Sequence, residues 1–259
     1  MLGKFIARGR TAEVYHWGEE HVLKLFYDFI PREAVTKEYN KTLNICKNNR
    51  LCPSPIEMIS YDSKDGIVYE NVKGKSLTTL LLNDFKGVKK VGELLANTHL
   101  LIHQNRCDEL ESVKESIERT IKSSLKLDEY KKNEILEILR DLPDDNVLCH
   151  MDYHTDNVFY DGTSINVIDW MTAGRGSPLA DVARTIVILR YAVLPFQNPI
   201  FKIFIKLFRE RLIKEYMDYY FSKSSLKKDN LEKWIKVIAA SRINERLPEG
   251  EIMKLMRII

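Results

Sequence analysis

The sequence predicts an α+β fold with a small antiparallel β-rich N-terminal lobe and a larger, mainly helical C-terminal lobe that carries a β insert. Three observations predict it. Strand-like runs dominate the chain up to about residue 70, apolar residues then recur with the period of helices, and short strand-like runs interrupt these helices near residues 147–168. We therefore expect two domains, residues 1–72 and 73–259, joined at a hinge at residues 69–73.

The N-terminal lobe is expected to contain five strands and one helix. Residues 17–20 and 62–66 supply hairpin turns. Pro31 opens the helix, because the missing N–H of a proline costs nothing in the first helical turn. The expected strands are Phe5–Ala7, Glu13–Trp17, His21–Phe26, Ile56–Tyr61 and Gly66–Glu70.

The C-terminal lobe is expected to be helical around its insert. The insert strands are Val147–Cys149, Val158–Tyr160 and Ile165–Ile168. The expected helices are Leu77–Asn83, Val88–Gln104, Glu109–Ser124, Asp128–Leu139, Leu179–Tyr191, Phe201–Phe221 and Leu231–Arg242.

Composition excludes several function classes. A net charge of +3 is too small to indicate a nucleic-acid partner. No apolar run reaches the roughly 18 residues of a membrane span, and the N-terminus lacks a signal-peptide pattern, so we expect a cytoplasmic protein with no membrane partner. The four cysteines show no CxxC spacing, so neither zinc nor a disulfide framework is expected, and Cys46 and Cys149 are expected to be small core residues.

Polar side chains stand where the insert strands end. Asp152 and Asn157 follow the first strand, and Asp169 ends the last. Phosphoryl transfer needs a carboxylate that accepts the proton of the attacking hydroxyl, and hard oxygen ligands that hold Mg²⁺ against the nucleotide phosphates. Asp152 fits the first role, and Asn157 with Asp169 fits the second.

Two histidines belong to the same segment. We expect His150 to shape the loop by a hydrogen bond to nearby backbone, and His154 either to do the same or to contact the substrate. A histidine-rich metal site made of His150, Asp152 and His154 is the competing interpretation, but it leaves the rest of the pattern unexplained. His99 and His103, four residues apart in an expected helix, have metal-ligand spacing but are more simply core or surface residues.

The segments 149–157 (CHMDYHTDN) and 167–170 (VIDW) resemble the HxDxxxxN and IDW motifs of the aminoglycoside phosphotransferase and choline kinase family, small-molecule kinases with a protein-kinase-like bilobal fold. The resemblance implies ATP and Mg²⁺ as cofactors, Asp152 as catalytic base, and Asn157 and Asp169 as magnesium ligands. It also implies that Asp181 braces the catalytic loop from inside the lobe; by pattern alone Asp181 could equally face solvent in a first helical turn.

The sequence departs from the family pattern at three places near these motifs. Met151 stands where glycine is usual, Met171 where an acidic residue is frequent, and Ser177 replaces an aspartate before Pro178. None of these departures removes a catalytic group.

The N-terminal lobe is expected to bind the nucleotide. The turn with Gly9 and Thr11 lies between two strands and matches a glycine-rich phosphate loop only at Gly9 and Val14. Lys24, flanked by apolar residues on a strand, needs a partner if it points inward; Glu38 is preferred over Glu33.

Two further regions concern ligand recognition. The adenine is expected to meet backbone groups of the hinge, Glu70 to Val72. Near the acceptor, Trp170 and Glu245 are substrate candidates beside His154, and an aromatic cage for a choline-like cation could draw on Tyr153, Trp170, Tyr191 and Trp234.

We therefore expect an ATP- and Mg²⁺-dependent kinase that acts on a hydroxyl of a small molecule. Aminoglycosides, choline-like alcohols, sugars and amino-acid alcohols all fit, although the basic C-terminal third argues against a polycationic antibiotic. The alternative is a nucleotide-binding pseudokinase or scaffold without turnover. A protein kinase is disfavoured, because only eight residues separate Asp169 from Pro178, too few for a peptide-docking segment.

Overall fold

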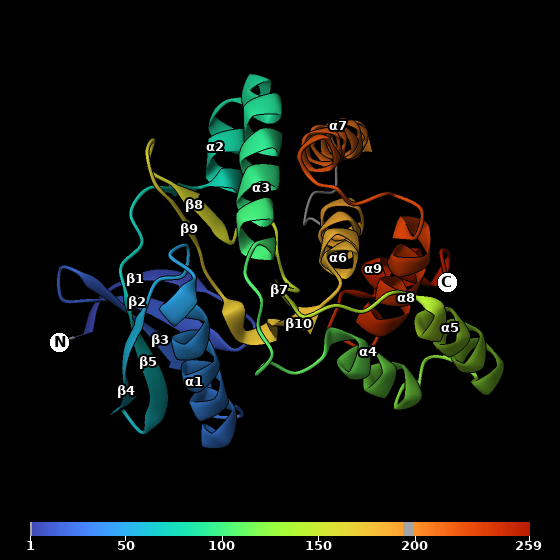
Figure 1. Cartoon of the computed structure of the whole chain (residues 1–259). Helices are drawn as coiled ribbons and strands as arrows, with labels where there is room; N and C mark the ends of the chain where they lie inside the picture. The colour runs from blue at the N-terminus through green and yellow to red at the C-terminus, as the bar shows by residue number, and fades with distance from the viewer. Residues whose placement is uncertain (1, 194–198) are drawn as a thin grey trace. The chain divides into compact units, whose positions relative to one another are not determined.

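The computed structural model describes residues 2–193 and 199–259, and the chain divides into two compact units (Figure 1). Unit 1 comprises Met1–Ser76 and Val158–Met171, and unit 2 comprises Leu77–Asn157 and Thr172–Ile259. The segment that carries Asp169 thus belongs with the N-terminal strands, although it lies far along the sequence.

Unit 1 is built on a five-stranded antiparallel sheet with the order β1-β2-β3-β5-β4. Its helix is α1 (Arg32–Asn48), for which Pro31 is the N-cap. The strands are β1 (Leu2–Arg8), β2 (Ala12–Trp17), β3 (His21–Phe26), β4 (Pro55–Tyr61) and β5 (Lys64–Glu70). A second sheet of three short strands joins β6 (Lys75–Ser76), β8 (Val158–Tyr160) and β9 (Ile165–Val167).

The large sheet has an apolar core on each face, because successive strand residues point to opposite sides. Phe26 and Ile67 pack with Val35 of α1 on one face. Leu23 and Leu25 pack with Val68 on the other. Alternation therefore directs Lys24, between two residues of the second core, toward the α1 face.

The β4–β5 turn is shorter than predicted. Residues 62–66 were expected to turn, but β5 begins at Lys64 and pairs at once with Tyr61. Asp62 and Ser63 alone make the turn, with φ of 49° and 63°. Two consecutive positive φ values match the right-handed twist of a hairpin, so the tight turn extends the strand pairing.

Unit 2 is mainly helical. Helix α3 (Val88–His103) lies beside α7 (Pro199–Lys223), and α6 (Pro178–Tyr191) lies beside α8 (Leu231–Arg242) (Figure 1). A two-stranded sheet pairs β7 (Val147–Cys149) with β10 (Gly174–Gly176). The helices are α2 (Leu77–Asn83), α3 (Val88–His103), α4 (Val113–Lys122), α5 (Glu129–Asp141), α6 (Pro178–Tyr191), α7 (Pro199–Lys223), α8 (Leu231–Arg242) and α9 (Glu249–Met256), with 3₁₀ turns η1 (Phe85–Gly87) and η2 (Trp170–Thr172), the latter crossing the unit boundary.

Capping residues explain where two helices begin. The predicted helix at residue 109 starts only at Val113, because the Ser112 hydroxyl accepts the N–H of Glu115 and fixes the first turn there. Asp128 caps α5 in the same way through the N–H of Lys131. No helix among the described residues is long and apolar enough to cross a membrane. The predicted α+β fold is confirmed.

Candidate active site

The catalytic-loop candidate, residues 150–157, follows β7 in unit 2. The Asp181 carboxylate braces its start: Oδ2 accepts the N–H of His150 at 2.5 Å, and Oδ1 accepts that of Met151 at 2.9 Å. Asp181 is fully buried, which excludes the solvent-facing alternative. Burial opposes the ionisation of Asp181, but its close contacts with the His99 and His103 imidazoles outweigh burial and hold the pKa of Asp181 well below its usual range. The carboxylate is therefore a permanent anion behind the loop.

His150 and Met151 shape the backbone that precedes Asp152. The buried His150 ring accepts the N–H of Asp152 at Nδ1, 3.2 Å away, which is the loop-shaping bond expected from the sequence. Met151 has a φ of 60°, in the left-handed region that favours glycine. The family's usual glycine at this position thus has a physical reason, and this chain places a buried methionine in the same conformation.

Arg184 is a loop-supporting residue that the sequence interpretation missed. Its Nε donates to the carbonyl oxygen of Met151, and its Nη2 lies 2.7 Å from Glu245 Oε1. Arg184 stands three residues after Asp181 on α6, and residues at this spacing share one helix face. That spacing is the signal that could have revealed it.

Asn157 and His154 close the loop. The Asn157 amide donates from Nδ2 to the carbonyl oxygen of Asp152, 2.9 Å away, so its Oδ1 is the atom left to act as a ligand. His154 contacts Asn157 Nδ2 at 3.3 Å and accepts the N–H of Asp156 at 3.3 Å. These contacts favour a loop-shaping role for His154. The Asp152 carboxylate lies 3.9 Å from His154 Nε2 and is partly exposed.

Unit 1 holds the second group of predicted residues. Lys24 Nζ lies 2.7 Å from Glu38 Oε1 and 3.1 Å from Asp169 Oδ1, so the preferred pairing with Glu38 is present. Burial lowers the pKa of Lys24, but the negative charges of Asp169 and Glu38 outweigh it and the pKa is raised. The Tyr69 hydroxyl also donates to Glu38, at 3.2 Å. Lys24 is therefore a fixed cation beside Asp169.

The side chain of Asp169 is partly exposed, whereas that of its neighbour Trp170 is buried. Asp169 has a φ of 65° and a side chain that is 40% exposed, so a carboxylate oxygen can meet a ligand. Trp170 is buried, and its indole N–H donates to the carbonyl oxygen of Val167 at 2.8 Å. A buried ring with its N–H already bonded cannot contact an acceptor in this conformation, which speaks against the predicted substrate role of Trp170.

The phosphate-loop and hinge candidates are also in unit 1. The turn at Gly9 is closed by its N–H, which donates to Ala12 O at 2.8 Å, and Thr11 O accepts the N–H of Tyr27. At the hinge, the N–H of Glu70 donates to Ser54 O, and that of Asn71 to Glu20 O.

Val72 differs from its two hinge neighbours. The described residues show no partner for its N–H, and it is half-buried. In the predicted hinge, Val72 therefore keeps a backbone donor available, while the N–H groups of Glu70 and Asn71 are occupied.

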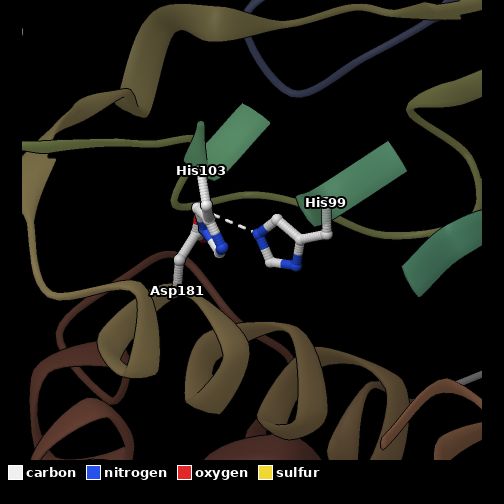
Figure 2. Close-up of side chains that lie close together, drawn as sticks. All are labelled: His99, His103 and Asp181. Carbon is white, nitrogen blue, oxygen red and sulfur yellow. Dashed lines mark hydrogen bonds and ion pairs between the residues drawn. The ribbon is translucent and has the colours of Figure 1, made fainter. Parts of the chain in front are cut away.

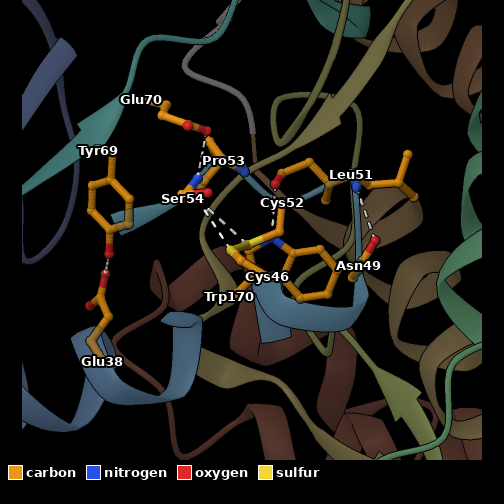
Figure 3. Close-up of a disulfide and its surroundings, with 11 residues drawn as sticks. Glu38, Cys46, Asn49, Leu51, Cys52, Pro53, Ser54, Tyr69, Glu70 and Trp170 are labelled. Atoms are coloured by element: carbon orange, nitrogen blue, oxygen red, sulfur yellow. Dashed lines mark hydrogen bonds between the residues drawn. A yellow bond between two sulfur atoms is a disulfide. The ribbon is translucent and has the colours of Figure 1, made fainter. Parts of the chain in front are cut away.

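A disulfide joins Cys46 to Cys52, which the sequence interpretation did not expect (Figure 3). Helix α1 ends at Asn48, and the chain turns back so that two cysteines six residues apart meet. Trp170 lies beside this bond in Figure 3, and the N–H of Val167 donates to Leu51 O at 2.7 Å. The disulfide therefore ties the end of the helix that carries Glu38 to the segment that contacts β9.

The acceptor-binding candidates of unit 2 are either buried or paired with other side chains of the unit. Glu245 pairs with Arg184 and also lies 3.4 Å from Arg242 Nη1. Tyr153 and Trp234 are fully buried, and the Tyr153 hydroxyl donates to Leu95 O. Tyr153 and Trp234 belong to the unit 2 core and Glu245 is paired with two arginines, so neither an uncompensated acidic contact nor an aromatic cage from Tyr153 and Trp234 is available.

Two clusters thus stand out, one in each unit. Unit 2 gathers Asp152, Asn157, His150, His154 and Asp181, and unit 1 gathers Lys24, Glu38 and Asp169. The Asp169 carboxylate of unit 1 and the Asn157 amide oxygen of unit 2 are each a hard oxygen donor of the kind Mg²⁺ prefers.

The sequence matches the model of the phosphotransferase enzyme family over residues 3–221. The chain belongs to this family. It is a phosphotransferase of the small-molecule kinase class, and the resemblance to aminoglycoside phosphotransferases and choline kinases is confirmed. A search of curated protein sequences finds no match.

Solved structures of other phosphotransferases share the fold at low identity. A thermostable mutant of aminoglycoside phosphotransferase APH(4)-Ia, in a ternary complex with AMP-PNP and hygromycin B, is 14% identical with a TM-score of 0.64, covering 99% of this chain and 90% of its own. The amicoumacin kinase hAmiN, in complex with AMP-PNP, Ca²⁺ and Ami, is 14% identical with a TM-score of 0.62, covering 98% and 86%. A choline/ethanolamine kinase family protein from Mesorhizobium loti is 13% identical with a TM-score of 0.61, covering 99% and 88%.

Proposed function

We propose that this phosphotransferase transfers the γ-phosphoryl group of ATP to a hydroxyl of a small molecule. The observation that carries the proposal is the fixed cation at Lys24, held between Glu38 and Asp169. A lysine kept charged beside a partly exposed carboxylate suits a polyphosphate and its metal ion.

Asp152 is proposed as the catalytic base that accepts the proton of the attacking hydroxyl. Its backbone is held from behind by His150, and that of the preceding residues by Asp181. Such a rigid support suits a group that must meet a hydroxyl at hydrogen-bond distance. The support does not depend on the identity of the acceptor.

Asn157 and Asp169 are proposed to hold Mg²⁺, and Lys24 to contact the nucleotide phosphates. When bound, Mg²⁺ neutralises phosphate charge that would otherwise oppose the transfer. Gly9 and Thr11 are proposed to cover the phosphates. Val72, the hinge residue whose N–H keeps no internal partner, is proposed to read the adenine together with the carbonyl oxygen of Glu70.

The acceptor is proposed to be a neutral or anionic alcohol. One of the structures compared above is an aminoglycoside phosphotransferase and another belongs to the choline/ethanolamine kinase family, so a cationic acceptor is the alternative to weigh. In this chain Glu245 is neutralised by arginines, and Tyr153, Trp170 and Trp234 are buried. These features remove the acidic contact and most of the aromatic cage that a cation would use.

The competing function is a nucleotide-binding pseudokinase without turnover. We would incubate the protein with ATP, Mg²⁺ and a panel of alcohols, comprising sugars, amino-acid alcohols, choline-like alcohols and aminoglycosides, and measure ADP release beside the Asp152→Ala variant. The proposal expects Asp152-dependent ADP release with at least one acceptor. Binding of ATP with no such release for any acceptor would favour the pseudokinase.

A further inference from the structure

Two histidines and an aspartate converge inside unit 2, behind the start of the catalytic-loop candidate (Figure 2). His99 and His103 lie one turn apart on α3, and Asp181 projects from α6. His99 Nε2 is 3.0 Å and His103 Nε2 is 3.3 Å from Asp181 Oδ2. Three potential ligand atoms of these residues lie within 4.8 Å of one another.

We propose that His99 Nε2, His103 Nε2 and Asp181 Oδ2 bind a divalent transition-metal ion such as Zn²⁺, which links α3 to the brace of the catalytic loop. Imidazole nitrogens and one carboxylate oxygen are a common zinc ligand set, and a water molecule can take a fourth position. The site has a structural role, so it adds no step to phosphoryl transfer.

The orientation of His99 distinguishes a metal site from a simple hydrogen bond. Its Nε2 is fully buried and close to Asp181, yet it makes no hydrogen bond with any described residue, because the ring does not aim its N–H at the oxygen. The ligand atoms of a metal ion point at the ion and therefore do not point at one another. A buried imidazole nitrogen that lies close to a carboxylate oxygen, without aiming its N–H at that oxygen, fits this arrangement.

The other ring nitrogen of each histidine, Nδ1, has the kind of hydrogen-bond partner that metal-ligating histidines have. His99 Nδ1 lies 2.7 Å from the Tyr216 hydroxyl, and His103 Nδ1 lies 2.7 Å from the Tyr220 hydroxyl. An Nδ1–H that donates to a hydroxyl leaves the Nε2 lone pair free for a metal and fixes the ring orientation. Both tyrosines come from α7, so three helices build the site.

Charge also favours a cation at this place. Burial and the neighbouring His103 lower the pKa of His99 to about 4, so His99 is a neutral ligand near pH 7, while Asp181 is anionic. The competing arrangement is a network in which each tyrosine hydroxyl donates to Nδ1 and each Nε2–H points at Asp181. His103 meets the geometry of that network, whereas His99 does not.

The full-length protein would be stripped with a chelator and titrated with Zn²⁺ by calorimetry in excess Mg²⁺, which occupies the proposed catalytic site. All proteins would carry Cys107→Ser, so that the half-buried thiol cannot bind zinc. We expect one Zn²⁺ per chain and a rise in Tm, since a ligand that binds only the folded state stabilises it. Co²⁺ in place of Zn²⁺ should give the visible absorption of a low-symmetry site.

Three variants make the test specific. His103→Gln should abolish Zn²⁺ binding and the Co²⁺ absorption, and the milder Tyr220→Phe should weaken zinc affinity by about tenfold or more, as loss of a ligand's outer partner does. His16→Gln, a histidine of β2 in unit 1, should bind zinc as the parent does. Circular dichroism checks that each variant folds.

Two results would overturn the proposal. If the folded protein binds no Zn²⁺ in excess Mg²⁺, the cluster is a hydrogen-bonded network only. If Zn²⁺ binds but neither His103→Gln nor Tyr220→Phe changes its affinity, the ion sits elsewhere.

Discussion

Lys24 keeps its charge because two carboxylates surround it in a largely buried position. Replacing it by methionine would leave Glu38 buried without a cation, and breaking such a pair costs about 3–5 kcal/mol. We therefore expect Lys24→Met to lower the free energy of unfolding by about that amount, measured by urea denaturation.

The control for Lys24→Met removes both charges of the buried pair. In the double variant Lys24→Met/Glu38→Gln, no buried charge remains unpaired, so most of the lost stability should return. If the double variant were as unstable as the single one, the charge of Glu38 would not be the cause.

Met151 allows a backbone prediction at the single-residue scale. A left-handed φ costs a residue with a Cβ about 1–2 kcal/mol relative to glycine. Met151→Ala loses the buried side chain and keeps that cost, whereas Met151→Gly loses the side chain and avoids it. We expect Met151→Gly to have a higher Tm than Met151→Ala and a free energy of unfolding that is larger by about 1 kcal/mol. The reverse order would contradict the strained φ.

Candidate residues that follow from local spacing could be named from the sequence, whereas contacts with residues distant in the chain could not. The positions of Asp152, Asn157 and Asp169 could be read from one continuous segment. The burial of Trp170, and the pairing of Arg184 with Glu245 across 61 residues, depend on how separate elements pack. The hydrophobic periodicity of one sequence carries no information about such long-range contacts.

At the scale of elements, strands and helices with clear periods were predicted well. The bounds of β3, β7 and α8 are those expected, because alternation or helical spacing is uninterrupted there. The short strand β10 escaped prediction, since Gly174–Gly176 has no strand propensity and forms only by pairing with β7. The Cys46–Cys52 bond escaped because it depends on where α1 ends.

That disulfide gives an element-scale prediction. Closing a loop this short stabilises a protein by about 2 kcal/mol in the chain-entropy model. We expect a reductant to lower the free energy of unfolding of the wild type by about this amount and to leave Cys46→Ser/Cys52→Ser unaffected. A thiol assay on the unfolded, unreduced protein should find only Cys107 and Cys149 free; four free thiols would mean that the bond is absent in solution.

At the scale of the whole molecule, the family and the fold agree with what the motifs alone predict. The chain is a phosphotransferase with a five-stranded sheet in one unit and a helical second unit that carries Asp152. The acceptor was not predictable from the sequence, because the burial of Trp170 and the pairing of Glu245 with Arg184 depend on how separate elements pack. The buried aromatic residues and the arginine pairs of Glu245 are the basis of our proposal that the acceptor carries no strong positive charge.

The central claim is that Asp152 is the base of an ATP-dependent transfer to a hydroxyl. The most direct measurement is kcat for the best acceptor of the panel, compared between wild type and Asp152→Asn, with nucleotide affinity measured in parallel. We predict that kcat falls by about 10²–10⁴-fold, as loss of general-base catalysis does, while nucleotide affinity stays within a few-fold. An unchanged kcat in a variant that still binds the nucleotide would contradict the account.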